Sequence, residues 1–225
     1  SEVEGNLDVH FIDVGQGDAI LMQTYGENGV NVLVDAGDWN KKEAVEYLDD
    51  LDIDTLDLVV GSHPHADHIG QLDKIISEYD VEEVWMSGDV ATSQVFERVI
   101  DAIDESGASY VEPEAGEHYT VGDIEIDILS PAELKGDLNN GSIVMRVDYG
   151  EVSFLLTGDA EGKAEKDMLE RGEDLEVDIL KAGHHGSDTS STEEFIQEVN
   201  PDVVVMQVGK DNKYSHPMQS VLDRF

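Results

Sequence analysis

One segment of the chain, Gly61-Ser-His-Pro-His-Ala-Asp-His-Ile-Gly70, carries most of the information about its chemistry. An apolar run over residues 58–60 precedes it and is typical of a strand, and a helical pattern over residues 71–79 follows it. Four of its side chains offer the imidazole and carboxylate groups that zinc and similar divalent ions accept. The four are His63, His65, Asp67 and His68. On a loop, the first pair can face one ion and the second pair another, so the segment predicts a centre for two metal ions.

The H-x-H-x-D-H pattern of this segment resembles the signature of the metallo-β-lactamase superfamily. Four other segments are similar to one branch of that superfamily, namely the metallo-hydrolase domain of ComEC-type competence proteins and its stand-alone relatives. They are Phe11-Ile-Asp-Val-Gly-Gln-Gly-Asp18, Leu33-Val-Asp-Ala-Gly37, Phe154-Leu-Leu-Thr-Gly-Asp159 and Leu180-Lys-Ala-Gly-His-His-Gly-Ser187. The segments fall in the family's order, and the resemblance runs from about Leu7 to the C-terminus.

Hydrophobic periodicity predicts an element order that is β-rich, then α/β, then β-rich and α/β again, which indicates a two-fold pseudo-repeat rather than separate domains. We predict strands at 7–14, 19–23, 30–34, 58–60, 81–86, 109–111, 119–121, 124–129, 142–148, 152–157, 177–181 and 203–207, and helices at 41–50, 71–79, 93–106, 161–171, 192–199 and from 217. The resemblance implies an α/β (α+β) fold, a four-layer αβ/βα sandwich with the metal loops along one edge. We expect one domain over residues 1–225, with residues 1–6 as a linker and a C-terminus that stops short of a strand usual in the family.

The resemblance also implies roles for individual residues. The implied metal ligands are His63, His65, Asp67, His68, Asp159 and His185, with Asp159 bridging the two ions. The implied catalytic residues are Asp67, His184 and His216. The residues alone leave open which of His184 and His185 binds metal, since the other can contact substrate or act as a general acid. Asp35, at the end of a strand, resembles a carboxylate that accepts the second N–H of a metal-bound histidine, although a plain turn aspartate is an equal alternative.

Candidate substrate contacts are polar residues near strand ends. They are Asn140, Ser142, Ser187 and Tyr214. For the first two, a role at a turn and a strand start is an equally good explanation, and Ser187 can instead cap its loop. His216, which precedes a proline, can likewise be a loop anchor.

The chain departs from many superfamily members because it has no histidine between His118 and His184. The ComEC-like branch shares this departure. The first metal site would then have fewer protein ligands and an open coordination position, which a catalytic site needs.

Charge limits the environment and the partners of the protein. The chain of 225 residues has 13 Lys and Arg against 52 Asp and Glu, a formal net charge of −39 and a pI near 4.1. Such charge destabilises a compact fold at low ionic strength, whereas salt near 1 M shortens the Debye length to about 3 Å. We therefore interpret the protein as halophilic and expect an archaeal source. Nucleic acid stays open as a substrate, bound locally at the metal site, because molar salt also removes most counterion-release affinity.

Several classes are excluded by what the sequence lacks. It has no cysteine, which excludes disulfides, a thiolate nucleophile and Cys-ligated metal. It has no apolar run long enough for a membrane segment and no signal-peptide pattern. We expect an extracellular or cell-surface location, leaving a cytoplasmic one open, and we leave open a link to a membrane uptake protein in a longer parent chain.

These observations predict a metal-dependent hydrolase with two divalent ions, zinc or manganese. The similarity to the ComEC branch implies a phosphodiesterase or nuclease that acts on DNA, in single-stranded form, through a metal-activated hydroxide. The alternatives are an amide or ester hydrolase of the same fold, such as a promiscuous β-lactamase, and a non-catalytic metal-binding module.

The charge analysis generates a first prediction. The melting temperature should be higher in 2 M KCl than in 0.1 M KCl by about 10 °C, because salt screens the repulsion among the acidic side chains. Scanning calorimetry would measure it, with an uncharged osmolyte as the control for general effects of a cosolute. Equal melting temperatures at the two salt concentrations would contradict the halophilic interpretation.

Overall fold

The computed structural model describes residues 6–225, so the predicted linker lies outside the described part of the chain except for Asn6. The first half of that part forms a six-stranded mixed sheet. Its strands, in spatial and chain order, are β1 Leu7–Phe11, β2 Ile20–Thr24, β3 Asn31–Val34, β4 Thr55–Gly61, β5 Asp80–Met86 and β6 Ser109–Val111. Strands β1 to β3 pair antiparallel, and β3 to β6 pair parallel.

The second half repeats this plan. Its strands are β7 His118–Val121, β8 Ile124–Ser130, β9 Val144–Tyr149, β10 Val152–Leu156, β11 Ile179–Lys181 and β12 Val203–Val205. Strands β7 to β10 pair antiparallel, and β10 to β12 pair parallel. Each sheet therefore begins with an antiparallel part and ends with a parallel part, as the predicted pseudo-repeat requires.

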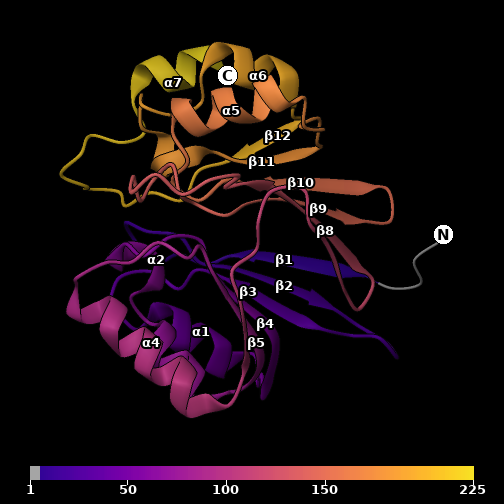
Figure 1. Ribbon diagram of the computed structural model, residues 1–225, viewed down its shortest axis with the longest axis vertical. Coiled ribbons are helices and arrows are strands. Elements are labelled where there is room, and N and C mark those ends of the chain that lie inside the picture. Colours follow the sequence, from indigo (N-terminus) through magenta and orange to yellow (C-terminus); the bar gives the residue numbers. More distant parts are fainter. Residues whose placement is uncertain (1–5) are drawn as a thin grey trace.

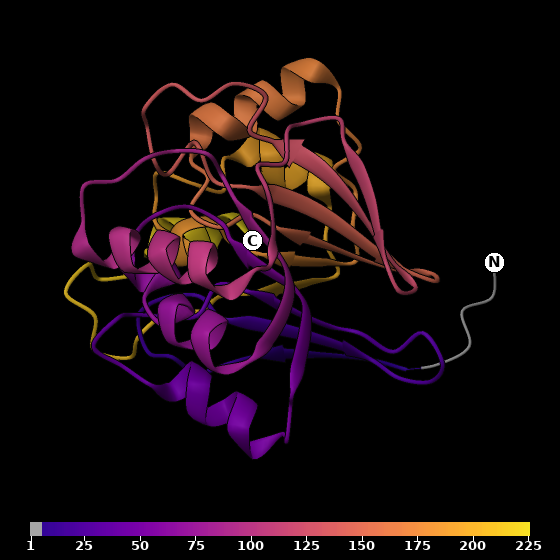
Figure 2. The same cartoon turned by 60° about the horizontal axis from the view of Figure 1, so that its bottom comes forward.

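Helices cover the outer face of each sheet (Figure 1). The helices on the first sheet are α1 Glu43–Asp50, α2 Ala66–Ile69, α3 Leu72–Glu78 and α4 Gln94–Ser106, and those on the second are α5 Gly162–Arg171, α6 Glu193–Val199 and α7 Gln219–Arg224. The turned view in Figure 2 shows the same succession of helices, sheet, sheet and helices. The predicted four-layer αβ/βα sandwich is confirmed.

Three apolar clusters hold the layers together. One lies between the two sheets, and the other two lie between each sheet and its helices. Strand β4 shows why its sequence is apolar throughout: Leu58 and Val60 pack between the sheets, while Val59 packs toward the helices. A strand that is buried on both faces reads as a continuous apolar run rather than an alternating one.

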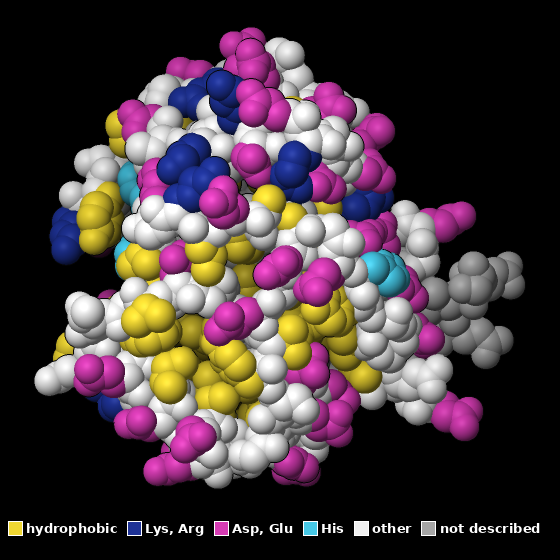
Figure 3. Space-filling view, viewed as in Figure 1, with side chains coloured by type: hydrophobic (Ala, Val, Ile, Leu, Met, Phe, Trp, Pro, Cys, Tyr) yellow, Lys and Arg dark blue, Asp and Glu magenta, His cyan; other side chains and the backbone are white. Residues whose placement is uncertain are grey.

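Acidic side chains are spread over the face shown in Figure 3 rather than gathered in one patch, which agrees with a solvated acidic surface. Among residues 6–225, no helix combines the length and the apolar character that crossing a membrane requires.

The histidine-rich segment differs from the prediction in one respect. We expected Asp67 and His68 on a loop, but they lie on the short helix α2. Successive residues of a helix project about 100° apart, so the two side chains diverge. The His68 side chain is fully buried, whereas the Asp67 side chain is 30% exposed. A helix of four residues is too short to produce a recognisable periodicity, which is why the pattern did not predict it.

The turn before β2 approaches this helix closely. Gly17 has a φ of +142°, and a Cβ atom on it would lie 2.3 Å from the carbonyl oxygen of Asp67. The backbone N–H of Asp18 donates to the same oxygen at 3.2 Å. Only glycine fits between the turn and the metal-binding segment.

We predict that Gly17→Ala destabilises the protein by about 2–4 kcal/mol, because backbone strain and a clash with Asp67 act together. Gly15→Ala is the matched control: Gly15 also has a positive φ, +75°, but a Cβ there meets nothing within 4 Å. The Gly15→Ala substitution should lower the free energy of unfolding by only about 1–2 kcal/mol. Urea unfolding measures both values, and equal losses would show that the close approach to Asp67 contributes nothing.

Candidate metal centre

The candidate site lies where the parallel strands end. Asp35 follows β3, the segment 61–70 follows the body of β4, Asp159 follows β10, and residues 184–185 follow β11. The carboxyl ends of the parallel strands of a sheet share one edge, and ligands of open α/β sheets bind there. This edge lies on the left of the molecule in Figure 1. The predicted placement of the metal loops along one edge is therefore correct.

Asp35 fixes the histidines of the first half. Its Oδ1 accepts from the backbone N–H of Ser62 at 2.7 Å, and its Oδ2 accepts from the Ser62 hydroxyl at 2.7 Å. His68 Nδ1 lies 2.7 Å from the same Oδ2, and His63 Nδ1 lies 3.1 Å from the Ser62 hydroxyl oxygen. With both Nδ1–H groups donating into this network, the Nε2 atoms of the two rings face the centre. A carboxylate placed behind a histidine in this way is usual for metal ligands.

A first set of donor atoms, here called the inner group, consists of His68 Nε2, His185 Nε2, Asp159 Oδ1 and Asp67 Oδ2. The two imidazole nitrogens are 3.3 Å apart, and they lie 3.1 and 3.5 Å from Asp159 Oδ1. Asp67 Oδ2 lies 3.3 Å from His185 Nε2 and 4.0 Å from His68 Nε2. The two imidazole nitrogens and Asp159 Oδ1 are 3.1–3.5 Å apart, close to the roughly 3.3–3.6 Å between ligands held at about 2.0–2.2 Å by a tetrahedral ion, and Asp67 Oδ2 approaches them from the side of His185.

A second set of donor atoms, here called the outer group, consists of His63 Nε2, His65 Nδ1 and the other oxygen of Asp159, Oδ2. His63 Nε2 and His65 Nδ1 are 3.0 Å apart, and His63 Nε2 lies 3.6 Å from Asp159 Oδ2. His184 Nε2 also lies 3.6 Å from this oxygen. The two oxygens of Asp159 thus face different groups, which is the arrangement of a bridging carboxylate. The structure brings together all six sequence-predicted ligands and places His184 beside them.

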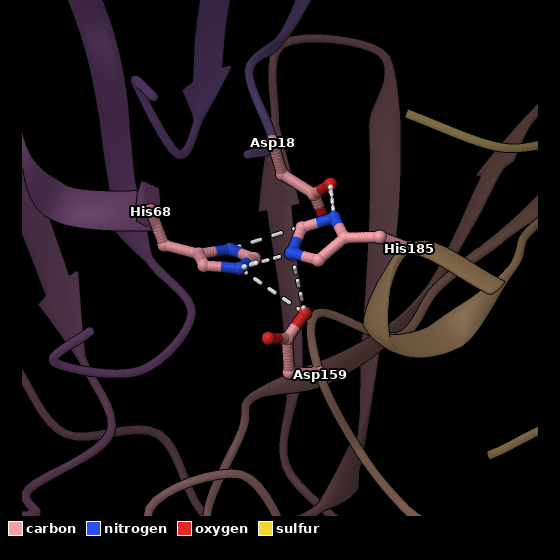
Figure 4. A group of neighbouring side chains, drawn as sticks. All are labelled: Asp18, His68, Asp159 and His185. Atoms are coloured by element: carbon pink, nitrogen blue, oxygen red, sulfur yellow. Dashed lines mark hydrogen bonds and ion pairs between the residues drawn. The ribbon is translucent and has the colours of Figure 1, made fainter. Parts of the chain in front are cut away.

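Asp18 lies behind the imidazoles rather than among the donors. Its Oδ1 is 3.3 Å from His185 Nδ1, and its Oδ2 is 3.9 Å from His68 Nδ1, so it meets both rings on the side away from their Nε2 atoms. Figure 4 shows Asp18 and Asp159 on opposite sides of the two rings. The Nζ of Lys181 lies 2.5 Å from Asp18 Oδ2, and both side chains are buried. This ion pair neutralises the charge of Asp18, which is shielded from solvent.

The pair His184 and His185 is held in a strained turn. Both residues have left-handed backbone angles, with φ of +50° and +55°. For residues other than glycine, such angles cost roughly 1–3 kcal/mol each and cluster at functional sites. His185 Nδ1 lies 3.0 Å from the carbonyl oxygen of Gln207, and His184 Nδ1 lies 3.1 Å from Glu161 Oε1. The Nε2 atom of His185 therefore faces the inner group, and the Nε2 atom of His184 faces the outer group.

Electrostatics in the cluster suit a cation. Burial alone would lower the pKa of His185, but the carboxylates of Asp159, Asp18 and Asp67 outweigh it and raise the pKa to about 9. The pKa of His68 is raised well above its usual value for the same reason, against its own burial. Burial favours a neutral Asp159, yet the charges of His68 and His185 hold its pKa well below the usual range. Protonated rings thus stand where the carboxylates attract positive charge.

The donor set also passes a test of fit for divalent ions. Asp159 Oδ1 is buried and accepts no well-aligned hydrogen bond within residues 6–225. Burial lowers the pKa of His63 well below its usual value, so this ring is neutral with a free lone pair. Neutral imidazole and ionised carboxylate are the forms that bind metal. The cluster of His and Asp residues therefore indicates a divalent-metal site.

A cavity of about 300 Å³ opens beside the donor groups. Its lining includes both predicted residues of the last loop, Tyr214 and His216, together with Gln16. The His216 ring lies 5.7 Å from the His184 ring, measured between centroids. Burial and then the neighbouring His184 and His185 lower the pKa of His216, so its ring is neutral at pH 7.

The other predicted substrate contacts do not line this cavity. Asn140 Oδ1 accepts from the backbone N–H groups of Glu161 and Ala164 and so caps the start of α5. The hydroxyl of Ser142 is fully buried and accepts from the N–H of Asp159. Ser187 is buried, and its hydroxyl bonds Thr189. The structure therefore gives these three side chains supporting contacts, which agree with the turn, strand-start and loop-cap alternatives rather than with the predicted contact to substrate.

Three residues with clear contacts in the site were missed from the sequence. Asp18 ends a segment that we quoted only for its resemblance, and Lys181 is a lysine in an apolar strand of a chain with 13 basic residues. These were signals that could have been used. Gln207 offered no signal in the sequence, because its contacts join opposite ends of the chain: its Nε2 donates to the carbonyls of Ile12 and Ala19.

The fold and this site define the class of the protein. A family model described as the metallo-beta-lactamase superfamily matches residues 12–210. The chain therefore belongs to the metallo-β-lactamase superfamily.

Within that superfamily, the chain is 31% identical over 237 residues to ComE operon protein 3 of Bacillus subtilis (strain 168), covering 97% of this chain and 30% of the relative. It is 32% identical to Recombination protein 2 of Haemophilus influenzae (strain ATCC 51907 / DSM 11121 / KW20 / Rd), covering 96% of this chain and 26% of the relative. The chain thus spans less than a third of either relative. The predicted resemblance to ComEC-type proteins is confirmed.

A solved structure shows the same fold at lower sequence similarity. It is that of the metallo-beta-lactamase fold protein YhfI from Bacillus subtilis, which superposes with a TM-score of 0.61 at 13% identity. The superposition covers 98% of this chain and 94% of that chain.

The inner group generates a prediction about protons. Because the folded-state pKa of His185 is raised to about 9, its protonation stabilises the metal-free protein below pH 6.5, and this stabilisation is lost as the pH rises through 9. Metal binding needs neutral rings, so adding Zn²⁺ or Mn²⁺ at pH 7 should release about one or two protons, and the affinity should rise up to about pH 9. Titration calorimetry in buffers of different ionisation enthalpy measures the release. Binding without any release would contradict the assignment of these rings as ligands.

Proposed function

We propose that this superfamily hydrolase cleaves phosphodiester bonds of DNA with two divalent ions, zinc or manganese, at the inner and outer groups. One observation carries the proposal: the two oxygens of Asp159 face two separate sets of histidine donors. Two ions that share a carboxylate lie about 3.5–4 Å apart, which suits in-line displacement at phosphorus. The proposed ligands are the six named from the sequence.

The residues of the chain divide the remaining work. A bound pair of divalent ions supplies an acidic water and neutralises the charge that develops on the phosphoryl oxygens. Asp67 is ionised because His68 and His185 lower its pKa against the effect of burial. From the rim of the inner group it can orient the attacking water. His184, held by Glu161 through Nδ1, lines the cavity, and in its imidazolium form it can pass the proton on Nε2 to the leaving oxygen while Nδ1–H stays on Glu161.

The last loop provides the opposite wall of the cavity. His216 lines the cavity, and its neutral ring can hydrogen-bond a phosphoryl or leaving oxygen there. Tyr214 lies beside it, with ring centroids 5.6 Å apart and planes at 23°. We assign both residues to substrate binding.

The choice of DNA rests on the relatives. One is named ComE operon protein 3 and another Recombination protein 2, and both match nearly the whole of this chain. The names of these longer proteins support a nucleic-acid substrate for this chain. An amide or ester hydrolase would use the same donors, so substrates of both kinds belong in one assay.

We predict that Asp67→Ala lowers hydrolysis of single-stranded DNA and of bis-p-nitrophenyl phosphate by at least about 1,000-fold, because the inner group loses a ligand. Removal of bound metal by a chelator should lower hydrolysis by the unaltered protein to the same extent, and added Zn²⁺ or Mn²⁺ should restore this activity. Circular dichroism should show an unchanged fold, since Asp67 is partly exposed.

Glu151→Ala is the matched control, because it removes an exposed carboxylate from the β9–β10 turn at the other end of the sheet. Its activity should equal that of the unaltered protein. Full activity of a folded Asp67→Ala variant would contradict the mechanism. Turnover of a chromogenic β-lactam without turnover of either phosphodiester would replace the proposed substrate by an amide.

A further inference from the structure

Two large aromatic side chains are exposed next to the candidate metal centre. Trp39 and Tyr214 are each 52% exposed, and both line a cavity of about 510 Å³. Asp67 and Tyr214 line this cavity as well as the one at the donor groups, so the two cavities adjoin. The other tryptophan, Trp85, is fully buried. Tryptophan is usually well buried, and an exposed aromatic beside a site is a hint of a ligand.

The loop that carries Tyr214 is held in place by Asn212. The Oδ1 of Asn212 accepts from the backbone N–H groups of Tyr214 and His216, and its Nδ2 donates to the carbonyls of Gly209 and His216. This loop follows β12 and projects from the left edge in Figure 1. The backbone that carries the exposed ring is therefore ordered before any ligand arrives, which lowers the entropy cost of binding.

The charges of the cavity select against an anion. Asp38, Asp67 and Asp211 line it, against the single cation Lys213, whose Nζ lies 5.0 Å from the Tyr214 ring centroid. Phosphate and carboxylate groups are repelled from such a cavity. A neutral, flat group that carries amino donors is favoured, because aromatic faces can stack on it and carboxylates can accept from it.

We propose that this aromatic cavity binds a nucleobase of a single-stranded nucleic acid, stacked on Trp39 beside the Tyr214 ring, next to the phosphodiester at the metal centre. The inference rests on the proposed function and names its substrate as a strand with unpaired bases. Bases inside a duplex are stacked on each other and cannot enter the cavity. Aromatic platforms of this kind bind single strands with little preference for sequence.

Tryptophan fluorescence tests the proposal without catalysis. A single-stranded octanucleotide should quench the emission of Trp39, while buried Trp85 stays constant as the internal reference. Trp39→Phe should lose the quenching, and the same octanucleotide as a duplex should cause none. Deoxyribose and ribose strands are both titrated, and the tighter one identifies the natural source of the base. No quenching by either strand, or equal quenching by the duplex, would overturn the proposal.

A kinetic experiment with an abasic strand isolates the contact. Replacing the bases around the cleaved bond by abasic sites should lower kcat/KM of the unaltered protein by about 5- to 150-fold, the usual contribution of one base stacked on an aromatic ring. Trp39→Ala should show the same loss on the normal strand and no further loss on the abasic strand. Tyr110→Ala is the control, since Tyr110 is 43% exposed but lies on β6 outside the cavity.

The outcomes separate the two proposals. If DNA is hydrolysed but Trp39→Ala loses the same factor on both strands, the nucleobase site is wrong and the nuclease stands. If no phosphodiester is cleaved but the single strand still quenches Trp39, the nucleobase site is supported and the proposed reaction is wrong.

Discussion

Three buried carboxylates lie at the edge between the two sheets, and their need for positive partners organises the site. Asp18, Asp35 and Asp159 are each at most 2% exposed. A buried charge without a partner costs far more than a surface ion pair contributes. The partners come from segments that are distant along the chain: Lys181 for Asp18, His68 for Asp35, and rings from both halves for Asp159. This edge forms only when both halves of the chain have folded against each other.

The pseudo-repeat explains how the two halves share the work. The first sheet supplies Asp35, which orients His68 through Nδ1, and the second supplies the Gln207 carbonyl, which does the same for His185. Each half therefore delivers one imidazole with its Nε2 directed at the inner group. Asp159 comes from the second half and faces donors from both.

The features that could be predicted from the sequence are those whose signal lies within a few neighbouring residues. The segment 61–70 places its donors within a few residues, and the periodicities of strands such as β4 are local too, so the fold and the six candidate ligands could be predicted from motif, pattern and resemblance. The contact between Asp18 and Lys181 joins residues that are far apart, and no pattern reports it. Asn140 offers a side chain that can bind a ligand or cap a helix, and only geometry shows that it caps α5.

The acidic surface and the proposed nucleobase site fit together physically. A chain with a net charge of −39 cannot attract a polyanion over long distances, and molar salt would cancel such attraction in any case. Under the two proposals, binding comes from short-range contacts that salt screens little, namely phosphate at the buried donor groups and base stacking on Trp39 beside Tyr214. Stacking is largely an apolar contact, which high salt strengthens rather than weakens. In the proposed nucleobase site, aromatic side chains at the rim thus take the place of the basic groove that a protein with the opposite net charge could use.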